Sequence, residues 1–163
     1  MIRESSVGNP DRCILLIKNG ADVDSVDVNG YTCLMRAAVN GHGDTCETLI
    51  SCGARIDRAE TNGYTALMWA AIKGHSDACE ILIKNGAEIN KADYYNYYTP
   101  LMRACINGHT ETAMSLIKLG ADIEKKDLRG VTALEYWKAY QDDPDLRAEV
   151  QRARKSFIMY RQP

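Results

Sequence analysis

The chain has 163 residues, 45% of them hydrophobic and 26% charged, with a formal net charge of −2, which is the balance of one globular domain with a sizeable core. Such a weakly acidic chain lacks the broad basic field that attracts phosphate groups, so we expect no nucleic-acid partner. Its aliphatic runs are too short to span a bilayer and its polar start, MIRESS, is unlike a signal peptide. We therefore expect a cytoplasmic protein without a membrane partner, and nuclear import stays open.

Several short motifs recur along the chain at steps of 33 or 34 residues. Gly-Ala begins at residues 20, 53, 86 and 120, Gly-His at 41, 74 and 108, and a threonine followed two residues later by leucine at 32, 65 and 132, with Thr-Pro-Leu at 99. Because these independent markers keep one register, the chain is predicted to be an array of similar units.

The first unit, residues 1–26, reads as a partial repeat without a hairpin, with helices over about 1–7 and 11–18. Its first helix carries the polar run Glu-Ser-Ser at residues 4–6. We expect this run to form the solvated outer face of an N-terminal cap.

The unit over residues 27–59 shows the full pattern. Asn-Gly at residues 29–30 signals a turn, and Thr32 is a good N-cap for a helix that ends at Gly41. A second helix over about 44–51 ends at Gly53, a typical C-terminal glycine. Two such short helices cannot bury their apolar faces alone, so the copies are predicted to stack as a solenoid.

This pattern resembles the ankyrin repeat family. The family motif, roughly D-x-x-G-x-T-P-L-H-x-A-A-x-x-G-H with an apolar helix and G-A-D-V-N after it, is matched over 27–59, 60–92 and 93–126. Methionine replaces the usual histidine at residues 35, 68 and 102, and the Thr-Pro pair is kept only at 99–100. The resemblance implies an all-α ankyrin-repeat solenoid, a single domain over 1–163, with three full repeats between capping repeats at 1–26 and 127–163.

The last unit departs from the repeat after Trp137, and Pro144 can start a final helix. Apolar residues at helical spacing would cover the last repeat, namely Leu146, Val150, Ala153 and Phe157. The same helix is locally basic through Arg147, Arg152, Arg154, Lys155 and Arg161. We interpret this basic face as a solvated cap rather than a second binding site.

The histidines and half of the cysteines follow the repeat. His42, His75 and His109 would lie roughly 10 Å apart in the stack, too far for one zinc ion, so they are expected to be structural. The same spacing places Cys13, Cys46 and Cys79 beyond disulfide reach, as small core residues. Cys33, Cys52 and Cys105 have no evident partner, and we expect neither a metal nor a cofactor.

No catalytic constellation accompanies the repeats. The chain lacks a glycine-rich phosphate loop, a Gly-x-Ser-x-Gly and a His-Glu-x-x-His motif, so we expect no enzyme activity.

The resemblance implies a binding surface made of hairpin tips and the exposed side of each first helix. At the family positions that point there, this chain carries tyrosine, tryptophan and arginine, the types most enriched at binding hot spots. The predicted partner-binding residues are Tyr31, Arg36, Tyr64, Trp69, Ile72, Lys73, Tyr94, Tyr95, Tyr97, Tyr98, Arg103 and Tyr136. For Tyr31, Tyr64 and Tyr98 a structural alternative is equally open, because they recur once per repeat and could stack on neighbouring hairpins.

Trp69 stands where the other repeats carry arginine or tyrosine, so we favour a binding role for it. Arg36 and Arg103 flank it, which suggests a partner segment with an acidic and an apolar part.

The stretch YYNYY, residues 94–98, contains the single insertion of the array, because Asp93 lies six residues before Thr99 where the other repeats have five. The turn glycine is missing there, and Asn96 is the expected substitute because asparagine tolerates positive φ. We predict that residues 94, 95 and 97 form an aromatic finger at the rim of the binding face; an incidental loop is the alternative.

These observations predict a monomeric, non-catalytic module that binds a protein or peptide as an adaptor, inhibitor or targeting domain. Two alternatives remain. The chain begins inside a repeat, so it could be the binding domain of a larger enzyme or effector. The resemblance also implies that Asn90, with Leu82 eight residues before it, could be the substrate of an asparagine β-hydroxylase, although an ordinary turn asparagine is the preferred interpretation.

Overall fold

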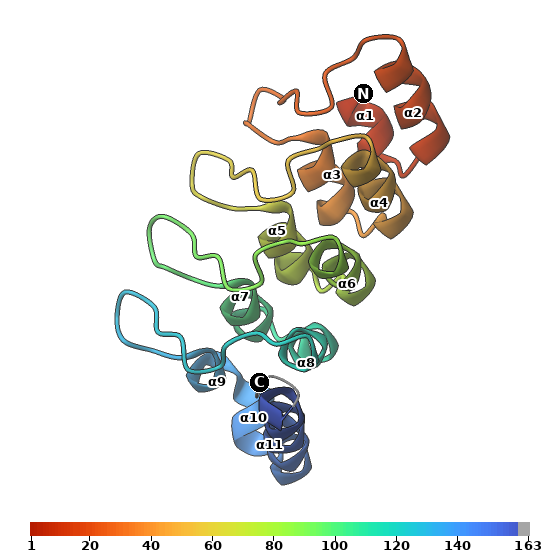
Figure 1. Cartoon of the computed structure of the whole chain (residues 1–163). Helices are drawn as coiled ribbons and strands as arrows, with labels where there is room; N and C mark the ends of the chain where they lie inside the picture. Colours follow the sequence, from red (N-terminus) through yellow and green to blue (C-terminus); the bar gives the residue numbers. More distant parts are fainter. Residues whose placement is uncertain (160–163) are drawn as a thin grey trace.

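The computed structural model of the chain describes residues 1–159, without the side chains of residues 154 and 156–159. It consists of helices joined by turns (Figure 1). The helices are α1 (Ile2–Ser6), α2 (Pro10–Lys18), α3 (Cys33–Val39), α4 (Gly43–Ser51), α5 (Ala66–Lys73), α6 (Ser76–Lys84), α7 (Pro100–Ile106), α8 (Thr110–Lys118), α9 (Ala133–Tyr136), α10 (Lys138–Asp142) and α11 (Pro144–Met159).

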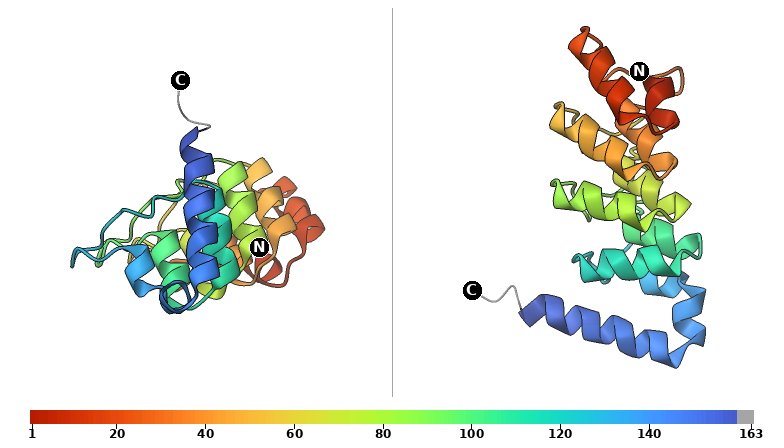
Figure 2. Two further views of the ribbon diagram at one scale, coloured as in Figure 1. Left: turned by 90° about the horizontal axis from the view of Figure 1, so that it is seen from below. Right: turned by 90° about the vertical axis from the view of Figure 1, so that its right-hand side faces the viewer.

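The helices form a stack of antiparallel pairs. The first helices α1, α3, α5, α7 and α9 pack on one another in order, and the second helices α2, α4, α6 and α8 form a parallel row that ends on α11. Figure 2 shows the two rows and places the N-terminus at the end of the stack opposite α11. Residues 1–159 contain no helix that is long and apolar enough to cross a membrane.

A hairpin precedes each of α3, α5, α7 and α9 and projects to the same side of the stack (Figure 1). One backbone bond closes each, from the N–H of residues 27, 60, 93 and 127 to the C=O of residues 31, 64, 98 and 131, at 2.9–3.1 Å. The hairpins build no sheet in the described part of the chain, where only the isolated bridges Val26–Thr32 and Lys126–Thr132 occur. The predicted all-α solenoid is therefore confirmed.

Threonine begins each first helix of the full repeats, as predicted. The hydroxyls of Thr32, Thr65 and Thr99 accept hydrogen bonds at 3.1–3.3 Å from the backbone N–H three residues later. The residues that donate are the methionines that replace the family histidine, and their side chains are buried in the core. The substitution leaves the helix start intact because this bond uses the backbone and not the methionine side chain.

The histidine of each Gly-His pair contacts the preceding repeat. The Nε2 atoms of His42, His75 and His109 lie 2.9–3.1 Å from carbonyl oxygens at the end of the preceding first helix. Each histidine ring packs directly over a glycine of the preceding repeat. A Cβ atom added at Gly41 or Gly74 would lie only 2.6–2.7 Å from the histidine ring, so the contact requires glycine there. The prediction of a structural histidine ladder is confirmed.

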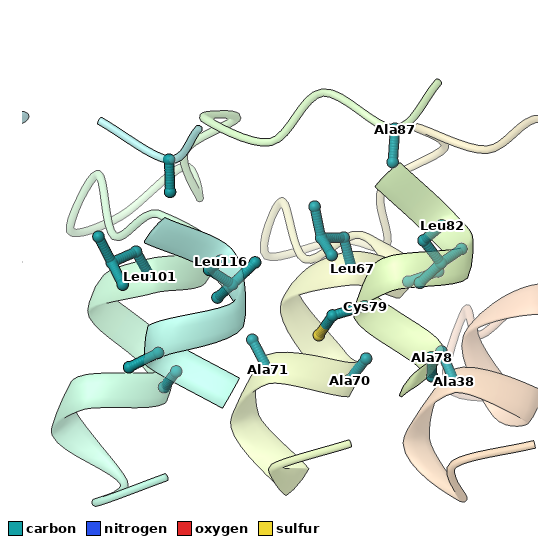
Figure 3. Packing of buried hydrophobic residues seen from close by; sticks show 14 of the residues in the cluster. Ala38, Leu67, Ala70, Ala71, Ala78, Cys79, Leu82, Ala87, Leu101 and Leu116 are labelled. Carbon is teal, nitrogen blue, oxygen red and sulfur yellow. The ribbon is translucent and has the colours of Figure 1, made fainter. Parts of the chain in front are cut away.

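Small residues allow the two helix rows to pack closely. In Figure 3, Ala70 and Ala71 of α5 face Cys79 of α6, and Leu67 and Leu101 occupy the same place in successive repeats. All of these side chains are fully buried. Burial raises the pKa of the Cys79 thiol to about 12, which agrees with its prediction as a core residue.

The two ends of the stack differ in part from expectation. Ser5 was expected in solvent, but it is fully buried because it occupies the position of Ala38 and packs beside Cys13, with Oγ 3.5 Å from Sγ. At the other end Trp137 is fully buried and stacks on Tyr140 at 5.9 Å, within the unpredicted bend that α10 forms.

The final helix packs on the last repeat. Leu146 and Val150 are buried, and α11 packs on α8, where a second helix would otherwise lie. The predicted contact of Phe157 and the expected solvent exposure of Arg154 and Arg161 concern side chains that lie outside the described part of the structure.

We predict that Gly74→Ala destabilises the fold by about 1–2 kcal/mol more than Gly108→Ala. Both glycines have positive φ, +78° and +73°, so the backbone strain is matched. Only at Gly74 would the new methyl group displace a histidine ring, that of His109, and break its bond to the Ile72 carbonyl. Urea unfolding measures the difference, and equal losses would contradict the proposed role of the ladder.

Candidate functional site

A carboxylate organises each hairpin; it is half-buried at Asp27 and buried at Glu60, Asp93 and Asp127. One oxygen accepts two backbone N–H groups of the turn, at 2.8–3.2 Å, in all four hairpins. The pairs of donors are residues 29 and 31 for Asp27, 62 and 64 for Glu60, 95 and 96 for Asp93, and 129 and 131 for Asp127. These bonds fix the backbone of the hairpin tips, so the tips are rigid supports for the side chains that they carry.

The two predicted arginines are paired inside the chain. The Arg36 guanidinium bonds to Asp27 through Nε at 2.8 Å, and Arg103 bonds to Asp93 at 2.6 Å. Their side chains are only 26% and 14% exposed. Both charges are therefore already compensated, and the structure gives no support to the expectation that these two residues attract an acidic partner segment.

The recurring tyrosines and Trp69 form one continuous chain of contacts, in which the Arg103 guanidinium joins the rings of Tyr64 and Tyr98. Trp69 lies 5.1 Å from both Tyr31 and Tyr64, and Arg103 lies 4.6 Å from the rings of both Tyr64 and Tyr98. Each aromatic pair stabilises the packing of neighbouring repeats by about 0.5–1.5 kcal/mol. The contacts favour the structural alternative for the recurring tyrosines, which are all half-buried.

Trp69 fits this ladder imperfectly. Its side chain is half-buried, yet its indole N–H is buried without an acceptor, an arrangement that costs about 1–3 kcal/mol. Glu60, the carboxylate of the same repeat, forms no ion pair among the described residues, because tryptophan stands where the neighbouring repeats have arginine.

Tyr136 closes the ladder at its C-terminal end. Its hydroxyl donates to Asp127, and its ring lies 5.7 Å from that of Tyr98. Burial alone would raise the pKa of Asp127, but bonds from Tyr136 and from the backbone of Val131 and Arg129 hold this pKa below its ordinary value. The hydroxyl of Tyr136 is thus engaged within the chain.

The predicted aromatic finger is exposed. Tyr94, Tyr95 and Tyr97 are 61%, 63% and 53% exposed, and we call residues 94–97 the tyrosine loop. The expectation for Asn96 is wrong, because the residue with positive φ is Tyr97, at +58°. The insertion places Tyr97 directly before Tyr98, in the position that glycine holds in the other hairpins.

Backbone bonds hold the tyrosine loop from both sides. The N–H of Tyr94 donates to the Asn62 carbonyl at 3.1 Å, and the Asn96 carbonyl accepts the N–H of Leu128 at 3.0 Å. These two bonds tie the loop to the preceding and the following hairpin, so its backbone is held in place.

The remaining predicted residues lie apart from the ring ladder. At the end of α5, Ile72 is half-buried and Lys73 exposed. Asn90 lies in a turn after α6, where its Oδ1 accepts the N–H of Asp122 at 2.8 Å. Asp57 makes the equivalent bond one repeat earlier, which supports the interpretation of Asn90 as a turn residue.

Two exposed residues of the same surface are absent from the predicted set. Val28 is 100% and Leu128 67% exposed, each at a hairpin tip. Both occupy the second position of their repeats, in register with Thr61 and Tyr94. An apolar residue at this position was the sequence signal that could have identified them.

The opposite side of the stack is hollowed but carries none of the predicted residues. An open hollow of ≈ 480 Å³ between α4 and α6 is lined by His42, Asp44, Asp77 and Ile81, among others. Nowhere in the described part of the chain do three or more histidine, cysteine or acidic residues come together as a metal site.

We expect Asp27→Asn to flatten the acid dependence of stability. Burial raises the pKa of Asp27, but bonds from Arg36 and the turn backbone outweigh this and lower it below the ordinary value. The charged carboxylate therefore stabilises the fold above its unfolded-state pKa, and this contribution is lost as the pH falls through the folded-state pKa. In urea unfolding between about pH 4 and pH 2, the free energy of unfolding should fall more steeply with decreasing pH for wild type than for Asp27→Asn. Equal slopes for the two proteins would contradict this prediction.

We expect Tyr97→Gly to stabilise the protein by about 0.5–1 kcal/mol, because glycine adopts positive φ without the strain of a Cβ. Tyr95 is the matched control: it is equally exposed and its φ is not positive. Tyr95→Gly should destabilise by a similar amount through the added freedom of the unfolded chain. Thermal unfolding measures the melting temperatures of both variants, and a shift of the two temperatures in the same direction would contradict the assignment of strain to Tyr97.

Comparison with known families agrees with the architecture. The family model described as "Ankyrin repeats (3 copies)" matches residues 2–93, and the model described as "Ankyrin repeat" matches residues 96–128. The comparison with curated proteins finds no match. With helix pairs, hairpins and family matches along most of its length, the chain belongs to the ankyrin repeat family.

Proposed function

We propose that this protein binds a partner protein or peptide through its hairpin face, which comprises the exposed hairpin tips (Val28, Tyr94, Tyr95, Tyr97 and Leu128) and the exposed side of α5. The observation that carries the proposal is the gathering of apolar side chains on this face. Nine large hydrophobic residues are exposed in the described part of the chain, and six of them belong to the hairpins, the sixth being Val26.

Exposure of these side chains has no folding benefit. Large apolar surface in contact with water is characteristic of interaction sites, and tyrosine is enriched at such sites because it combines a rigid ring with a hydroxyl group. Ankyrin repeats are generally protein–protein interaction modules, which agrees with this use of the surface.

The role of Trp69 follows from its incomplete fit. The fold supplies two ring contacts but no acceptor for its N–H. A partner that packs against the ring would add contacts to a residue that the ladder already holds in place, so we keep Trp69 as a binding residue.

The protein acts without catalysis, as an adaptor, inhibitor or targeting module. Ankyrin repeat proteins are typically non-catalytic, and the hollow between α4 and α6 is open rather than enclosed. Action as a monomer in the cytoplasm or nucleus forms part of the proposal. Hydroxylation of Asn90 gains no support from its surroundings, because its side-chain oxygen already bridges two repeats.

Site-specific photo-crosslinking tests the proposal. A benzophenone amino acid is placed at Tyr95 or Val28, on the hairpin face, or at Glu47, an exposed residue of α4 on the other side. In cells that express the protein, we expect discrete crosslinked species from the first two positions and none of them from Glu47. Crosslinks from Glu47 alone, or equally from all three positions, would place the interface elsewhere.

The partner identified in this way allows a test of Trp69. We expect Trp69→Ala to weaken binding by about 2 kcal/mol, in a variant whose folding is first verified by thermal unfolding. A change within about 0.5 kcal/mol would remove Trp69 from the binding residues.

A further inference from the structure

We infer that Asn29, at the tip of the first hairpin, is a site of spontaneous deamidation, and that the fold protects the other asparagine–glycine pairs of the chain. There are six such pairs, at residues 19–20, 29–30, 40–41, 62–63, 85–86 and 107–108. The asparagine is exposed in all six, so exposure alone does not distinguish them. This inference does not depend on the proposed binding function.

An asparagine–glycine pair can react without an enzyme, through its own backbone. The glycine nitrogen attacks the side-chain carbonyl carbon (Cγ) of the asparagine and loses its proton, while the side-chain amide leaves as ammonia. The product is a cyclic succinimide, which water opens at either carbonyl to give aspartate or isoaspartate. Glycine favours the first step because it has no Cβ to hinder the attack. The side-chain amide must be free to turn toward the glycine nitrogen.

The backbone is alike at all six pairs. Each glycine has a positive φ, between +73° and +98°, and its N–H donates at 2.9–3.2 Å to the carbonyl three residues earlier. This bond has to open at every pair before the nitrogen can react. Differences in reactivity therefore come from the asparagine side chain and from the groups that pack on the pair.

Four of the pairs follow a helix, and the side chains of their asparagines are held there. Each side-chain amide donates at 2.7–2.8 Å to the carbonyl four residues earlier, in the last turn of the helix; the asparagines are residues 19, 40, 85 and 107. The amide must give up this bond before its Cγ can meet the glycine nitrogen. The pair at residues 40–41 is also covered by the ring of His75.

The pair in the second hairpin is held in two ways. One oxygen of Glu60 binds the turn backbone, and the other accepts the Asn62 side-chain amide at 3.2 Å. This second oxygen is available because Trp69 stands where the neighbouring repeats have arginine. Tyr94 restrains the pair from the next hairpin: its N–H donates to the Asn62 carbonyl at 3.1 Å, and a Cβ added at Gly63 would lie 2.7 Å from its ring.

Asn29 occupies the same place in the first hairpin and has neither restraint. One oxygen of Asp27 binds the turn backbone, as in the second hairpin, but the other is taken by the Arg36 guanidinium. The Asn29 side chain forms no hydrogen bond within the part of the chain that the structure describes. A Cβ added at Gly30 would meet no atom of the next hairpin closer than 3.7 Å. Of the six asparagines, Asn29 is therefore the most free to react.

Deamidation would change the surface at this tip. Aspartate adds a negative charge beside Val28, which is fully exposed. Isoaspartate also adds a methylene group to the main chain, inside the turn in which Asp27 accepts the N–H groups of residues 29 and 31. A molecule that has reacted thus presents a different N-terminal end of the hairpin face.

Peptide mapping of the aged protein tests the inference. The whole chain is incubated at mildly alkaline pH, below its melting temperature, and mass spectrometry follows the replacement of NH₂ by OH at each pair. A hydrogen bond of this kind shifts an opening equilibrium by about two- to tenfold. We therefore expect Asn29 to react at least about fivefold faster than any of the other five. An advantage below about twofold over any other pair would overturn the inference.

The unfolded chain is the control for local sequence. In urea the side-chain bonds are lost, so the advantage of Asn29 should disappear. The same advantage in urea would assign the reactivity to the flanking residues and would overturn the structural explanation.

Two variants identify the reactive residue in the folded protein. Aged wild type should contain an acidic isoform on ion-exchange chromatography, and Asn29→Gln should remove most of it, because the longer side chain closes the ring far less readily. The variant should fold, since residue 29 contributes only its backbone N–H to the turn. Asn62→Gln, at the equivalent tip, should retain the acidic isoform. Equal amounts of this isoform in the two variants would overturn the inference.

Discussion

Each repeat of this protein depends on its neighbours, because helices of seven to nine residues cannot bury an apolar face unaided. The spacing between repeats is set where a histidine ring lies over a glycine and bonds to the backbone of the preceding helix. A side chain on that glycine would push the repeats apart. Since this contact recurs from repeat to repeat, the hairpins emerge at regular intervals on one side, and the composition of the hairpin face follows from the stack.

Within that row, some residues hold the hairpin face together and others form its exposed surface. The hairpin carboxylates Asp27 and Asp93 pair with Arg36 and Arg103 inside the ladder, so these charges are compensated within the chain. The tips carry the side chains that remain available. Trp69 belongs partly to both groups, because its ring is held by two tyrosines while its N–H has no acceptor. Substitutions at the tips of such a surface would change which partner it prefers and would leave the supporting contacts intact.

The fold could be predicted from the sequence because its markers report contacts that are repeated. A Gly-His pair at a constant step reflects the same glycine and ring in successive repeats, so one observation supports another. The sequence could not decide whether the recurring tyrosines stack within the fold or bind a partner. Contacts such as that between Tyr31 and Trp69, 38 positions apart, depend on ring geometry that residue spacing does not reveal. The preference of asparagine for positive φ led to the wrong prediction for Asn96. Its N–H is bonded to Asp93 and its carbonyl to Leu128. The insertion instead places Tyr97 in the position that glycine holds in the other hairpins.

The strain at Tyr97 has a consequence for recognition. A glycine adopts this backbone freely at three other hairpins, so tyrosine costs about 1 kcal/mol of stability without a folding gain. Strain of this kind persists where the surrounding bonds determine the conformation, and it often marks functional loops. Here the bonds to Asn62 and Leu128 hold the loop in place before any partner arrives. Binding to a loop that is already ordered loses less conformational entropy, because the cost of ordering the loop has been met on folding and not on binding.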